Sequence, residues 1–74
     1  MEYPQEPADM PEPISSREGC KVGWRTYSTE QEAEKASAYW RKLASYKWSQ
    51  GYDFGYQVPG AIRKVENGFE VTIP

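Results

Sequence analysis

The chain has 74 residues and a formal charge of −2, with eleven acids, nine bases and no histidine. This length allows one domain at most. No apolar run approaches the roughly 20 residues that span a bilayer. The single cysteine excludes a disulfide within the chain. We therefore expect a soluble, cytoplasmic protein that does not enter a membrane.

Residues 1–19, MEYPQEPADMPEPISSREG, contain four of the six prolines and carry five acids against one base, a formal charge of −4. Prolines interrupt helices and strands, and the segment has few large apolar residues with which to offset its ordering entropy. It also lacks the basic start and apolar run of a signal peptide. We expect residues 1–19 to be a disordered acidic tail and residues 20–74 to form the single domain.

The first expected element is a strand in the stretch CKVGWRTYS, which begins at Cys20. Val22, Trp24 and Thr26 alternate with other residues at the period of two that is typical of a half-buried strand.

A long helix is expected next. Ser28 or Thr29 can serve as its N-cap, with Gln31 or Glu32 completing a capping box, and Gly51 follows as a plausible C′ residue. One face collects Ala33, Ala36, Ser37, Trp40, Ala44, Lys47 and Trp48. We expect this face to lie on a sheet, with Trp40 and Trp48 as its two large side chains.

Two further strands, AIRKV (61–65) and FEVTI (69–73), flank Glu66-Asn67-Gly68, a strong hairpin signal. Two registers are open. An Asn67-Gly68 turn pairs Ile62 with Ile73, whereas a type I turn with a bulge at Gly68 pairs Val65 with Phe69, and we favour the second. The predicted fold class is α+β: a β-α-β-β domain with one long helix on a three-stranded, at least partly antiparallel sheet.

The sequence argues against catalysis. Without histidine the commonest general base and metal ligand is missing, Cys20 has no partner to activate it, and the glycines of GYDFG do not form a phosphate-binding motif. We expect a protein that is not an enzyme, holds no metal or cofactor, and acts by contact.

Three surfaces could make that contact. The favoured one is aromatic and joins a second helical strip to the loop after the helix, with a lysine at the rim; its residues are Tyr39, Lys42, Tyr46, Tyr52 and Tyr56. Equally, these rings could complete a small core. A nucleic-acid surface would use Arg41, Lys42, Arg63 and Lys64, and an outer hairpin edge could drive self-association. The oligomeric state compatible with this sequence is either a monomer or a dimer.

Two stretches, TYSTEQEAEKAS (26–37) and QGYDFGYQVPGAIRKVENGFEVTIP (50–74), resemble a type of small open reading frame of bacteriophage genomes. They cover about half of the chain. The resemblance implies a setting rather than a site: small phage proteins of this kind often bind a host protein and inhibit or redirect it. It assigns no functional residues.

Overall fold

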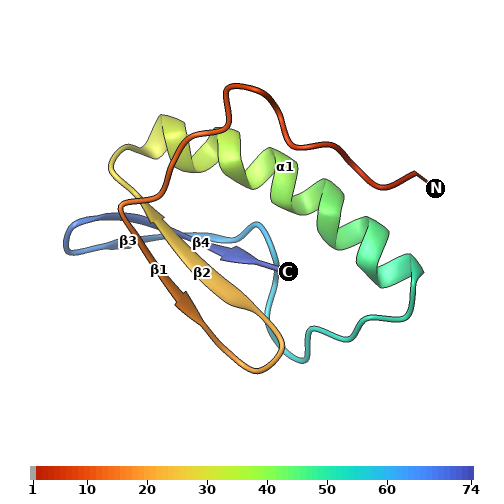
Figure 1. The fold of residues 1–74 in the computed structure, drawn as a ribbon. Coiled ribbons are helices and arrows are strands. Elements are labelled where there is room, and N and C mark those ends of the chain that lie inside the picture. Colours follow the sequence, from red (N-terminus) through yellow and green to blue (C-terminus); the bar gives the residue numbers. More distant parts are fainter. Residues whose placement is uncertain (1) are drawn as a thin grey trace.

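The computed structural model describes residues 2–74 as a four-stranded antiparallel sheet with one helix packed on it (Figure 1). The elements in chain order are β1 (Ser15–Glu18), β2 (Gly23–Tyr27), α1 (Glu30–Ser49), β3 (Ile62–Val65) and β4 (Gly68–Ile73). The strand order in the sheet is β1-β2-β4-β3. The α+β class is confirmed, but the topology is β-β-α-β-β rather than β-α-β-β.

The additional strand, β1, lies inside the segment predicted to be a disordered tail. Its sequence, Ser-Ser-Arg-Glu, has no apolar alternation, and all four residues are exposed. Side chains of β1 nevertheless hold it to β2: Arg17 lies 3.9 Å from the Trp24 ring centroid, and Glu18 pairs with Arg25 at 2.7 Å. A polar edge strand of this kind carries no hydrophobic periodicity by which the sequence would reveal it.

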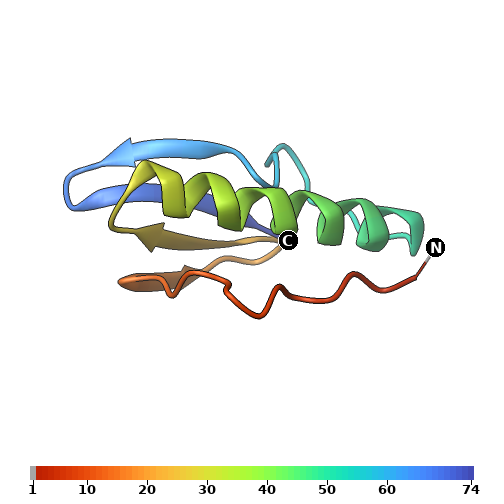
Figure 2. The same ribbon diagram turned by 90° about the horizontal axis from the view of Figure 1, so that it is seen from above.

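The N-terminal segment, residues 2–14, runs alongside α1 on the β1 side of the molecule (Figure 2). Met10 packs against the core, the Tyr3 and Tyr46 rings meet edge to face at 5.0 Å, and Asp9 pairs with Lys35 of the helix. The prediction of a disordered tail is therefore wrong for these residues, because basic and aromatic side chains of α1 offer them partners. Met1 lies outside the described residues.

Both ends of α1 follow the sequence signals. Thr29 is the N-cap, and its hydroxyl accepts a hydrogen bond from the Glu32 amide at 3.2 Å. In return the Glu32 carboxylate accepts hydrogen bonds from the Ser28 and Thr29 hydroxyls. These hydrogen bonds, that from Ser28 first, lower the pKa of Glu32. At the other end the Gly51 and Tyr52 amides donate to the carbonyls of Trp48 and Lys47, and Gly51 has a φ of +93°. This is a Schellman motif with glycine at C′.

The core lies between α1 and the helix-facing side of β2, β3 and β4. Its centre is Tyr27, Ala33, Ala36 and Val71, with Met10, Trp40, Ile62 and Phe69 packed around it. The helix buries Ala33, Ala36 and Ser37 as predicted, but it also buries Tyr39 of the second strip and the neighbouring Leu43. The buried face is thus turned toward that strip, because the N-terminal segment adds a wall there, and Trp48 is left outside.

The hairpin of β3 and β4 has neither of the two expected registers. Val65 pairs with Gly68 and Ile62 pairs with Val71, so the connecting residues are Glu66 and Asn67. Gly68 lies against the carbonyl oxygen of Tyr27, where a side chain has no room. This contact with β2, together with the burial of Ile62 beside Val71, decides the register, and neither is visible in the local turn sequence.

Candidate partner-binding surface

Exposed apolar side chains gather at the C-terminal end of α1 and in the loop that follows it. The exposed fractions are 68% for Trp48, 56% for Tyr52, 104% for Tyr56 and 67% for Val58. We call these four residues the aromatic surface. Trp48 and Tyr52 border one groove, and Tyr56 and Val58 follow in the same loop. Exposed large apolar groups of this kind are typical of sites where another molecule docks.

The aromatic surface is held in place by the loop geometry beneath it. The Schellman motif ends the helix at Ser49 and turns the chain at Gly51, so Tyr52 follows at a fixed position. Two residues later, Phe54 turns inward and is 6% exposed. Phe54 therefore anchors the loop in the core while its neighbours Tyr52 and Tyr56 stay outside.

Trp48 stands between two shallow grooves. One groove is lined by Ala44, Ser45, Phe54 and Pro59, and the other by Gly51, Tyr52 and Asp53, and Trp48 borders both. Trp48 thus separates the two grooves and is 68% exposed. Tryptophan is one of the residue types, with tyrosine and arginine, in which the binding energy of interfaces is concentrated.

Asp53 fixes the loop between the two exposed tyrosines. Its carboxylate accepts the Gly55 amide at 2.8 Å and the Lys21 ammonium at 3.3 Å, which ties the loop to the turn between β1 and β2. The Gly55 hydrogen bond, followed by Lys21, lowers the Asp53 pKa below its ordinary value of 3.8. The loop is therefore closed by a local turn and by a contact between distant parts of the chain.

The five residues predicted to bind a partner do not lie together. Tyr52 and Tyr56 are exposed, and Lys42 is exposed on the helix. Tyr39 is only 7% exposed, and its burial raises its pKa. Tyr46 is half-buried beside Tyr3. Tyr39 is thus covered from within the chain and Tyr46 partly so, whereas Lys42 and the two loop tyrosines lie on an open surface.

The sequence pattern places Trp48 on the core face of the helix, so the sequence analysis did not include it among the partner-binding residues. On the helical wheel it stands at the margin of that face, on the side away from Tyr39 and Leu43. That marginal position, next to the polar Ser45 and Ser49, is the sequence signal that could have indicated its exposure.

The four bases predicted to contact nucleic acid lie in different places. Arg41 extends across Gly60, and Lys42 stands on the outer side of α1. The neighbours Arg63 and Lys64 point to opposite faces of β3: Arg63 pairs with Glu70 at 2.8 Å, whereas Lys64 lies over the Phe69 ring. They do not form one basic track.

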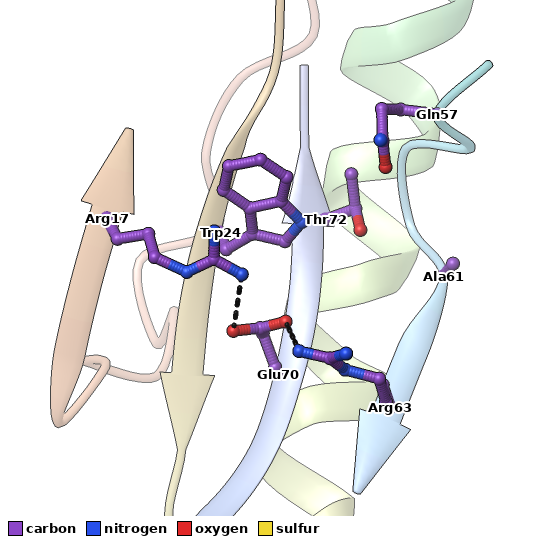
Figure 3. Close-up of a pocket in the computed structure, with 7 residues that line it drawn as sticks. All are labelled: Arg17, Trp24, Gln57, Ala61, Arg63, Glu70 and Thr72. Atoms are coloured by element: carbon purple, nitrogen blue, oxygen red, sulfur yellow. Dashed lines mark hydrogen bonds and ion pairs between the residues drawn. The ribbon is translucent and has the colours of Figure 1, made fainter. Parts of the chain in front are cut away.

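Apart from the two grooves beside Trp48, a hollow lies on the open face of the sheet, away from α1 (Figure 3). It has a volume of about 320 Å³ and is bordered by Trp24, Gln57, Ala61 and Thr72 and by three charged side chains. The Glu70 carboxylate lies between two guanidinium groups, 3.4 Å from Arg17 and 2.8 Å from Arg63. These charged groups already pair with one another. We therefore interpret the lining of the hollow as an ion-pair network that covers this face of the sheet, and not as a binding site.

Within residues 2–74, no cluster of three or more histidine, cysteine, aspartate or glutamate side chains is arranged to hold a metal ion. In the same range, no helix combines the length and the apolar character needed to cross a membrane.

Comparisons with protein-family models, with curated proteins and with solved structures found no match to this chain.

Proposed function

We propose that this protein is a small non-catalytic binding module that recognises another protein through the aromatic surface formed by Trp48, Tyr52, Tyr56 and Val58. The observation that carries the proposal is that these four exposed side chains occupy one end of the helix and one loop. Tyrosine and tryptophan give an interface large contact area at a low entropic cost.

The construction of the surface supports this proposal. Phe54 and the Schellman motif fix the backbone under the exposed rings, so little order has to be gained when a partner binds. A surface that is rigid before binding is favoured for recognition over one that must first be ordered. This surface keeps Tyr52 and Tyr56 of the sequence-based hypothesis and adds Trp48 and Val58. It omits Tyr39, Lys42 and Tyr46.

The setting in which we propose to search for the partner is a bacterial cytoplasm, since the sequence resembles small phage open reading frames. There the module would inhibit or redirect a host protein by occupying one of its surfaces. A second function in nucleic-acid binding gains no support from the dispersed positions of Arg41, Lys42, Arg63 and Lys64.

The proposal is tested by affinity capture from nuclease-treated bacterial lysate with the wild type and with a Trp48→Ala, Tyr52→Ala double variant. We expect a discrete protein that the wild type retains at high salt and the double variant does not. Ile14→Ala is the matched control, because Ile14 is 53% exposed but belongs to the N-terminal segment. Equal capture by the wild type and the double variant would refute the assigned surface.

A further inference from the structure

The charges around the aromatic surface are almost all of one sign. Between Lys35 and Gly60 the sequence contains a single acid, Asp53, and that carboxylate is already paired with Lys21. The bases in the same stretch are Lys35, Arg41, Lys42 and Lys47. The other acids of the chain lie in the N-terminal segment, in β1, at the start of α1, and in the β3–β4 hairpin.

Two bases border the aromatic surface at separate points. The Lys47 ammonium lies 5.1 Å from the Tyr52 ring centroid. Arg41 extends over Gly60, next to the Pro59 that lines the groove beside Trp48. A third base, Lys21, lies near Phe54 and Tyr56, but its charge is already paired with Asp53. An apolar centre with a basic rim is complementary to apolar side chains that are flanked by carboxylates.

The same helix already holds a segment with this chemistry on its other flank. The N-terminal segment is acidic, and it binds α1 through an aspartate on a lysine, Asp9 with Lys35, and through a ring on a ring, Tyr3 with Tyr46. Its Met10 side chain supplies an apolar anchor in the core. An extended acidic segment with apolar anchors is therefore a ligand that this helix accommodates.

We infer that the aromatic surface binds an acidic segment of its protein partner, in which carboxylates flank an aromatic or aliphatic anchor. The anchor packs beside the Trp48 ring, in the groove over Phe54, and the carboxylates meet Arg41 at one end and Lys47 at the other. This inference rests on the proposed function, because it names the chemistry of the partner that the same surface would bind.

The test is a selection of random displayed peptides on the full-length protein, with the Trp48→Ala, Tyr52→Ala variant as counter-target. We expect the enriched peptides to be rich in aspartate and glutamate around an apolar residue. A representative peptide should then bind about five- to tenfold more weakly to an Arg41→Glu, Lys47→Glu variant, as expected for the loss and reversal of two rim charges. Lys42→Glu is the control: it reverses one charge on the outer side of the same helix, away from the aromatic surface, and should leave the affinity nearly unchanged.

The other possible results separate the inference from the proposed function. Enriched peptides that need Trp48 but contain no excess of acids, or that ignore the Arg41 and Lys47 changes, overturn the inference and leave the proposed function intact. If no peptide distinguishes the wild type from the counter-target, the proposed surface fails and the inference fails with it. Binding of a single-stranded oligothymidylate probe that depends on Trp48 would replace the acidic protein segment by nucleic acid.

Discussion

At the scale of single residues, Asp53 determines how the loop presents Tyr52 and Tyr56. Its hydrogen bond from Gly55 and its pairing with Lys21 both favour the carboxylate and lower its pKa below 3.8. Because the pKa in the folded protein is lower than in the unfolded chain, this contribution is complete above about pH 5 and is lost as the pH falls through the lowered pKa. We expect the Gly55 amide resonance to titrate with a midpoint below 3.8 and to show no such titration in Asp53→Asn. A midpoint at or above 3.8 would mean that the loop is not closed in this way.

At the scale of elements, two glycines with positive φ offer a matched pair of substitutions. Gly51 has a φ of +93° and nothing near the position of an added methyl group, whereas Gly60 has a φ of +92° and lies directly under the Arg41 side chain. We expect Gly51→Ala to lower the free energy of unfolding by about 1 kcal/mol through backbone strain alone. Gly60→Ala should cost about 2–3 kcal/mol, because Arg41 must also move. Urea denaturation measures both; equal losses would show that Arg41 does not lie across Gly60.

The N-terminal segment is the second element whose role can be measured. Met10 packs against the core, so Met10→Ala should lower the free energy of unfolding by about 1–2 kcal/mol, less than for a fully buried methionine. Asp9→Asn should leave the thermal midpoint unchanged, since the exposed Asp9–Lys35 pair is open to water and salt. If Met10→Ala is also without effect, the segment does not dock on α1 and the sequence-based prediction of disorder holds.

At the scale of the whole molecule, the sequence allowed the helix, its two ends, the hairpin and the α+β class to be predicted. Those features depend on local signals: the Thr29 cap, the Gly51 stop and the alternation of Phe69, Val71 and Ile73. It did not reveal β1, the hairpin register or the docking of the N-terminal segment. Each of these depends on contacts between distant residues, such as Arg17 on Trp24 and Gly68 on Tyr27.

The candidate site was predicted in part for the same reason. Tyr52 and Tyr56 follow a helix end and precede a turn, and local sequence was enough to suggest their exposure. Which flank of α1 is buried depends on the N-terminal segment, and the sequence pattern alone assigned Trp48 to the core and Tyr39 to the surface. The positions of the two rings are the reverse of that prediction.

Trp48 and Tyr52 are assigned to an exposed surface and not to the core, and thermal unfolding distinguishes the two. We expect the Trp48→Ala, Tyr52→Ala double variant to shift the midpoint by less than about 3 °C, as is usual for surface substitutions in a domain of this size. Leu43→Ala is the reference, because Leu43 is only 5% exposed and its truncation should lower the midpoint by about 10 °C or more. If the midpoint of the double variant falls as far as that of Leu43→Ala, the two rings are part of the core and not of an exposed surface.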